Sequence, residues 1–123
     1  MAEKRTTVTL REAGEFGQVQ IADEVVAIIA GLVTKEEGAV ICDKMTNKEL
    51  HSCSLSMKCI KFDAMLSIDE KYRENIIAEI RETYKYMLDQ GATSVWEVIE
   101  GDYAFGNAGS LCHGWSSVPV LYL

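Results

Sequence analysis

The chain has 123 residues, 48% of them apolar, which is enough for one small domain or two part-domains but not for two full domains. Its 19 acidic and 12 basic residues give a net charge of -7. The basic residues are scattered rather than arranged in a stripe, which argues against a nucleic-acid partner. The longest apolar run, VVAIIAGLV, is much shorter than a membrane span, and the first residues lack a signal-peptide pattern. We therefore expect a cytoplasmic protein without a membrane span.

Residues 14–40 predict a short strand followed by a helix. Alternation of polar and apolar residues from Gln18 to Ile21 is typical of a strand, and Asp23 can cap the helix after it. Gly31 weakens this helix and Gly38 marks the turn after it, whereas residues 39–46 favour no particular structure. The apolar positions of the helix are Val25, Val26, Ile28, Ile29, Leu32 and Val33.

Two capping boxes predict two consecutive helices. The first box is Thr46–Glu49 (TNKE), followed by an irregular apolar segment, and the second is Ser67–Glu70 (SIDE). The second helix has apolar residues at three- and four-residue steps, an expected pair between Asp69 and Arg73, and an end at Gly91. With a turn at residues 66–67, the two helices form an αα-hairpin. The recurring residues of the second helix are Tyr72, Ile76, Ile77, Ile80, Tyr84, Met87 and Leu88.

The connection after Gly91 is long, irregular and rich in glycine. A connection of this length either lines a site or is disordered, and the aromatic residues Tyr103 and Phe105 within it favour an ordered loop. Beyond it, Ser110 is expected to cap a short helix that carries His113 and Trp115 and ends before Pro119.

The cysteines show no CxxC spacing, and we expect free, mostly buried thiols rather than a disulfide framework. A zinc site is the alternative, but a ligand pair such as His51 and Cys53, or Cys112 and His113, has poor spacing for tetrahedral coordination. We therefore predict no metal and no cofactor. The four cysteines are Cys42, Cys53, Cys59 and Cys112.

Different parts of the chain resemble different families. The stretch VQIADEVVAIIAGLVTKEEGAV, residues 19–40, carries a resemblance of residues 14–38 to the opening of the alkaline shock protein family of envelope-stress proteins. The pieces CSLSMKCIKFDAML, YMLDQGATSVWE and NAGSLCHGWSSVPV occur in order within residues 48–123. They resemble the late helices of the catalytic domain in α-L-rhamnosidase-like, six-hairpin glycoside hydrolases.

The second resemblance implies a carbohydrate site. It assigns Glu97 as the general base that activates water, and His113 as a residue that contacts the sugar. Trp96 and Trp115 would offer apolar faces to a pyranose ring. Without the resemblance, the expectation for Glu97 is a surface carboxylate, for the two tryptophans core positions, and for His113 a hydrogen-bonded side chain.

The resemblance also implies that the catalytic pair is incomplete. Inverting glycosidases need a general acid and a general base roughly 6.5 to 9.5 Å apart. In these enzymes the acid lies on earlier helical hairpins, and the shock-protein-like segment stands in their place here. We therefore expect a glycoside hydrolase fragment without turnover of its own.

The expected fold is mainly α: a strand–helix segment at residues 1–40, and at residues 41–123 a helical part of a six-hairpin (α/α) barrel. Such a fragment would leave the apolar face of its long helix uncovered, at positions such as Tyr72, Ile76, Ile80 and Met87, so we expect self-association. Two alternatives stay open. One is a non-enzymatic envelope-stress or interaction protein that assembles through residues 18–33, and the other is a chimeric or truncated reading frame.

Overall fold

The computed structural model of the chain describes residues 21–50 and 52–123, and the secondary structure of this part is entirely helical. The α-helices are α1 (Ile21–Ile29), α2 (Lys35–Thr46), α3 (Lys58–Ile68), α4 (Arg73–Asp89) and the short α5 (Ala104–Asn107). Four 3-10 segments accompany them: η1 (Leu55–Met57), η2 (Glu70–Tyr72), η3 (Gly101–Tyr103) and η4 (Gly114–Tyr122). The prediction of a mainly α fold is confirmed.

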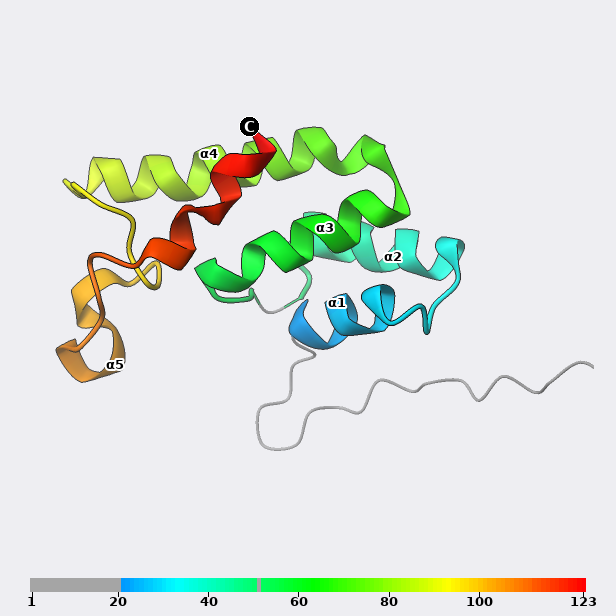
Figure 1. Ribbon diagram of the computed structural model, residues 1–123, viewed down its shortest axis with the longest axis horizontal. Coiled ribbons are helices and arrows are strands. Elements are labelled where there is room, and N and C mark those ends of the chain that lie inside the picture. Colours follow the sequence, from blue (N-terminus) through cyan, green and yellow to red (C-terminus); the bar gives the residue numbers. More distant parts are fainter. Residues whose placement is uncertain (1–20, 51) are drawn as a thin grey trace, which may run out of the picture.

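Helix α3 is the centre of the structure (Figure 1), with α1 and α2 packed against one side and α4 running back along another. The segment η4 lies along both α3 and α4. Its Tyr122 ring meets the Phe62 ring edge-on at 5.3 Å, and the Tyr122 hydroxyl donates to the Cys59 carbonyl at 2.8 Å. Phe62 is consequently sealed from solvent.

A single core joins residues 21–40 to the rest of the described chain. Val25 and Ile28 of α1 and Met45 of α2 pack with Phe62 and Met65 of α3. Helix α2 also runs continuously through the expected boundary at residues 40 and 41. Burial of such side chains stabilises the fold by about 1.5 to 3 kcal/mol each, so the first helices contribute directly to the stability of the rest.

The start of the described chain differs from the sequence prediction. Helix α1 begins at Ile21, so Asp23 lies inside the helix rather than at its cap. The expected strand therefore does not reach Ile21, and its residues 18–20 lie outside the described part. The helix ends at Ile29, before Leu32 and Val33, because the chain turns at Gly31 with a φ of 66°.

Helix α2 was not predicted, and Gly38 lies inside it rather than in a turn. A capping box starts this helix: the Thr34 hydroxyl accepts from the Glu37 N–H, and the Glu37 carboxylate accepts from the Thr34 N–H at 2.7 Å. Gly38 is buried, and a Cβ atom there would lie 2.4 Å from the Ile68 Cδ1 atom. The glycine thus allows α2 to approach the end of α3 closely.

The two predicted capping boxes do not start helices where expected. Thr46 is the last residue of α2, so the predicted start at TNKE is wrong, and Lys48 in the connection has a φ of 59°. Helix α3 extends to Ile68, beyond the predicted turn at residues 66–67. Asp69 then caps the next turn, where its side chain accepts from the Lys71 N–H at 2.9 Å.

The αα-hairpin of α3 and α4 and the end of α4 before Gly91 are confirmed. The expected partner of Arg73 is not, because its guanidinium pairs with Glu70 at 2.8 Å while Asp69 serves as the cap. The prediction of an uncovered face on the long helix is also wrong. Tyr72, Ile76, Ile80 and Met87 are all buried, since α2, α3 and η1 with Trp96 supply the cover.

Replacement of Thr34 by alanine tests the cap of α2. Loss of an N-cap hydroxyl leaves a backbone N–H without its partner and costs about 1 kcal/mol, so Thr34→Ala should lower the free energy of unfolding by that amount in a urea titration. The matched control is Thr46→Ala at the other end of the same helix. The Thr46 hydroxyl donates to the Cys42 carbonyl within the helix, and its loss should change stability by less than about 0.5 kcal/mol. Equal losses in the two variants would contradict the assignment.

Candidate functional site

The connection between α4 and η4 forms a loop that is closed by backbone hydrogen bonds. Two backbone hydrogen bonds pair its ends: the Glu97 N–H donates to the Ser110 carbonyl at 2.9 Å, and the His113 N–H donates to the Val95 carbonyl at 2.8 Å. The two segments therefore run antiparallel beside each other. This pairing places three of the four residues implied by the rhamnosidase resemblance, Trp96, Glu97 and His113, on adjacent stretches of backbone.

The Trp96 ring is the anchor of the loop. It is buried against Leu55 and Met87, where η1 meets the end of α4. Gly101 lies against the ring with a φ of 64°, and a Cβ atom there would lie 3.1 Å from the Trp96 Cζ3 atom. The ring thus fixes where the loop returns to the helical body.

Glu97 and His113 are both half-buried. One carboxylate oxygen of Glu97 accepts from the Ser110 N–H at 3.2 Å. A carboxylate has roughly four acceptor positions, so this hydrogen bond leaves capacity for water or a sugar hydroxyl. His113 is the residue before η4, with an extended backbone, so it is not carried within a helix.

Ser110 does not cap a helix, contrary to the prediction. Its hydroxyl instead bonds locally to the backbone of Cys112, and η4 begins four residues later, at Gly114. Pro119 lies inside η4 rather than after it. The reason is that residues 110–113 are committed to the extended pairing with residues 95–97.

Trp115, the fourth implied residue, points its side chain to solvent and is 70% exposed. Tyr103 and Phe105 in the same part of the chain are also largely exposed. Phe105 has a φ of 53°, an uncommon conformation for a residue other than glycine. The loop and the start of η4 therefore present aromatic side chains outward.

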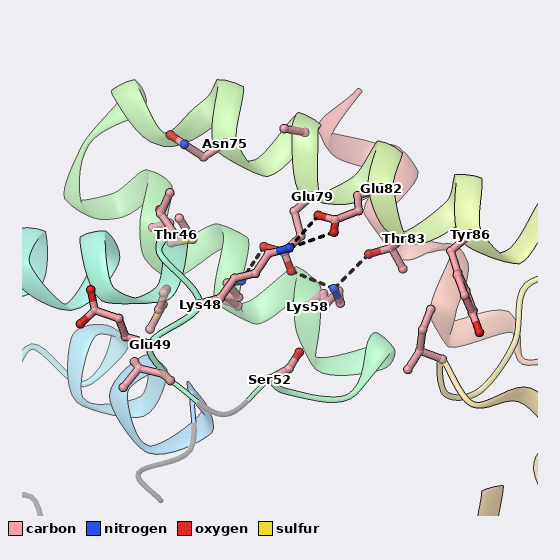
Figure 2. A pocket seen from close by; sticks show the side chains of 16 residues that line it. Thr46, Lys48, Glu49, Ser52, Lys58, Asn75, Glu79, Glu82, Thr83 and Tyr86 are labelled. Carbon is pink, nitrogen blue, oxygen red and sulfur yellow. Dashed lines mark hydrogen bonds and ion pairs between the residues drawn. The ribbon is translucent and has the colours of Figure 1, made fainter.

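A second candidate site was missed by the sequence reasoning. A groove of about 990 Å³ lies between the end of α2, the connection after it, and the facing sides of α3 and α4 (Figure 2). Its described lining includes none of the four residues implied by the resemblance. Lys58 and Lys61 of α3 line it, and Glu79 and Thr83 of α4 lie against them.

Glu79 holds the two lysines in one ion cluster. Its carboxylate oxygens lie 2.8 Å from the Lys58 Nζ atom and 2.5 Å from the Lys61 Nζ atom. The Lys58 ammonium also donates to the Thr83 hydroxyl at 3.2 Å. The lysine side chains are 9% and 3% exposed and the Glu79 side chain 23%, so the cluster is largely shielded from water.

Two opposing effects act on the pKa of Glu79. Burial alone would raise it, but the attraction of Lys61 and Lys58 and their hydrogen bonds outweigh burial and lower the pKa from its ordinary value of 4.5. The carboxyl is therefore ionised near neutral pH. Because the folded pKa is lowered, its contribution to stability is present above pH 4.5 and is lost as the pH falls through the folded pKa.

Sequence spacing carries a signal for this cluster. Lys58 and Lys61 are three residues apart and share a face of α3, while Glu79 and Thr83 are four apart and share a face of α4. In an antiparallel hairpin these two faces meet. What the sequence alone does not supply is the pairing register of the two helices.

Burial lowers the reactivity of the cysteine thiols, because it disfavours the thiolate form. Burial, with a smaller effect from Asp43, raises the pKa of Cys42 to about 11, and burial also raises the pKa of Cys53. Cys53 and Cys59 are half-buried and Cys112 is exposed, so the expectation of mostly buried thiols holds only for Cys42. Among the described residues no group of three or more potential ligands is arranged to hold a metal ion, and His51 lies outside them.

No protein-family model matches this chain, and neither the curated proteins nor the solved structures contain a match to it. Within residues 21–50 and 52–123, none of the helices combines the length and the apolar content that crossing a membrane requires.

Replacement of Glu79 by glutamine tests the ion cluster. The variant leaves two buried lysines without their counter-charge, and breaking a buried pair costs about 3 kcal/mol or more. The loss should appear as a lower free energy of unfolding in urea at pH 7. The difference from the unmodified protein should shrink as the pH falls below 4.5, because the Glu79 carboxylate then takes up a proton in both folded and unfolded chains.

The matched control is Glu82→Gln, one turn further along α4. Glu82 pairs with Lys48 at 2.8 Å, but both side chains are well exposed, at 65% and 72%. Exposed pairs contribute less than about 1 kcal/mol. If Glu82→Gln were as destabilising as Glu79→Gln, burial of the cluster would not be the source of its contribution.

Proposed function

We propose that the chain binds a carbohydrate through the loop between α4 and η4, and that it does not hydrolyse glycosides on its own. The observation that carries the proposal is the antiparallel pairing of residues 95–97 with 110–113. This pairing holds the Glu97 carboxylate, the His113 side chain and the exposed Trp115 ring on neighbouring stretches of backbone. A carboxylate, an imidazole and an aromatic face are the groups that recognise sugar hydroxyls and the apolar face of a pyranose ring.

Within this proposal Trp115 is the sugar platform, because 70% of it is open to solvent. Trp96 supports the site from below through its packing on Leu55 and Met87. Glu97 would act as the base side of an inverting site related to that of α-L-rhamnosidase-like enzymes. We assign no general acid to the chain, and a base without an acid does not complete the reaction.

The test combines an activity assay with a binding assay. An aryl α-L-rhamnoside should show no turnover, while rhamnose should perturb the NMR signals of the Trp115 indole. Trp115→Ala should weaken rhamnose binding by roughly two- to tenfold, since an aromatic contact contributes about 0.5 to 1.5 kcal/mol beyond buried area.

Leu121→Ala is the matched control, since Leu121 is an equally exposed apolar residue of the same segment η4, at 79%. Its rhamnose affinity should stay unchanged. Turnover that a Glu97→Gln variant abolishes would contradict the absence of an acid, and a lack of any rhamnose binding would refute the proposal.

Self-association is a second candidate, and an exposed apolar face on the first helix favours it. Val26 and Ile29 are three residues apart on α1 and are 59% and 57% exposed, and Leu32 comes next at 65%. Val25 and Ile28 of the same helix face the core and are buried. We infer that a second copy of the chain covers this outer face, as an interaction protein of the alkaline shock type would require.

Lysine substitution on that face separates assembly from folding. Ile29→Lys should shift the protein toward the monomer in sedimentation-velocity experiments, because a charge would have to be buried between the two copies. Leu88→Lys, at a 68% exposed position on α4, is the control and should leave the mass distribution unchanged. A monomeric parent protein, or an equal effect of both substitutions, would exclude this face as the contact.

A further inference from the structure

The groove between α3 and α4 has a buried positive charge in excess at its floor. Two ammonium groups, those of Lys58 and Lys61, share one carboxylate, that of Glu79. The remaining charged groups of the lining lie at the exposed rim, where Lys48 pairs with Glu82 and Glu49 faces solvent. Solvent and salt screen the rim charges far more than the buried ones. The floor therefore has one more ammonium group than carboxylates, while the lining as a whole, with three lysines and three glutamates, is neutral.

The hydrogen bonds of the cluster also leave donors unused. An ammonium group has three N–H donors. Within the described residues, the Lys61 Nζ atom donates to one partner, Glu79, although the Lys61 side chain is only 3% exposed. Lys58 uses two donors, on Glu79 and Thr83. A buried N–H donor without an acceptor costs free energy. A negatively charged acceptor would therefore both balance the excess charge at the floor and accept the unused N–H donors.

Part of the groove can accept an apolar body, beside the polar side chains of Thr46, Ser52 and Asn75 that also line it. Apolar side chains from α2, the connection after it, α3, α4 and the loop after α4 share the lining with the charged groups, and Tyr86 of α4 lies at one end of the groove (Figure 2). These apolar residues include Met45, Leu50, Met65, Ala78 and Ile99. The volume of about 990 Å³ lies within the roughly 300 to 1,000 Å³ of small-molecule sites.

We propose that this groove binds a small organic acid with one carboxylate and an aliphatic body. The carboxylate lies at the floor beside Lys58 and Lys61, where it balances the second ammonium and accepts the remaining N–H donors. The aliphatic body lies along the apolar lining toward Ile99. We specify a single negative charge because the floor has one more ammonium group than carboxylates. This site is separate from the carbohydrate site and does not depend on it.

Hexanoate and hexanol form the probe pair, measured by isothermal titration calorimetry and by thermal unfolding at equal ionic strength. Hexanoate should bind and raise the melting temperature, whereas hexanol, which lacks the charge, should bind at least roughly tenfold more weakly, the cost of losing a charge-assisted hydrogen bond. Equal binding of the two probes, or no binding of hexanoate, would overturn the proposal.

Lys61→Met is the decisive variant because it leaves Lys58 and Glu79 as a balanced pair with the buried volume nearly kept. It should fold with a stability close to that of the unmodified protein, and its hexanoate affinity should fall by roughly tenfold or more. Lys48→Met removes an equal charge from the 72% exposed rim and should change the affinity less than about twofold, given screening. An equal loss of hexanoate affinity in both variants would mean that the groove attracts the anion nonspecifically by its charge, without a defined site at the floor, and would overturn the proposal.

Glu79→Gln provides a measurement that does not depend on loss of binding. It raises the excess at the floor from one positive charge to two, so hexanoate should raise the melting temperature of this variant more than that of the unmodified protein, by mass action. A smaller rise in the variant, with folding shown by its circular dichroism, would count against the carboxylate lying beside the lysines.

Discussion

Helix α3 buries a broad face that carries two lysines as well as apolar residues, and the rest of the structure is arranged to cover that face. Lys58, Lys61, Phe62, Met65 and Ile68 all lie in the interior, whereas Ile60, Asp63 and Ser67 form the exposed side of the helix. A buried face of this width needs more than one neighbour to cover it. The first two helices, the long helix α4 and the C-terminal segment η4 supply those neighbours, and the buried lysines of α3 in turn demand the carboxylate of α4.

The long helix α4 could be predicted from the sequence because its pattern is one-sided. Its apolar residues recur at helical spacing, and the glycine at its end adopts the positive φ that ends helices. Helix α2 could not be found in the same way, since its residues KEEGAVICDKMT mix polarity and include a glycine. The expectation of an uncovered apolar face on α4 rests on the resemblance to a barrel fragment, and the sequence gives no sign of α2, whose residues join the core beside this face.

The capping boxes show that a local sequence pattern does not by itself determine where a helix begins. Thr34–Glu37 and Thr46–Glu49 have the same form, yet the first begins a helix and the second spans the end of that helix. The difference lies in the residues beyond each box. After Thr34 come Gly38, Cys42 and Met45, at steps of about one turn, and all three are buried. Tertiary packing selects between two equivalent local signals.

The two candidate sites also differ in whether a sequence pattern can predict them. The ion cluster of Lys58, Lys61 and Glu79 can be inferred from helical spacing once the hairpin is assumed. The approach of His113 to Val95 depends on how the intervening loop closes over Trp96, and that closure rests on a glycine contact with an aromatic ring. No periodic pattern encodes such a contact, so the sequence could name the residues of the loop but not their geometry.

The thiols of the chain span the whole range of burial, with Cys42 sealed in the core and Cys112 open to solvent. An alkylating reagent would reach Cys112 in the native protein, but Cys42 only after the contacts of α2 with α3 have separated. The ratio of the two modification rates would therefore report the opening equilibrium of the helical body, without an added probe or a change in sequence.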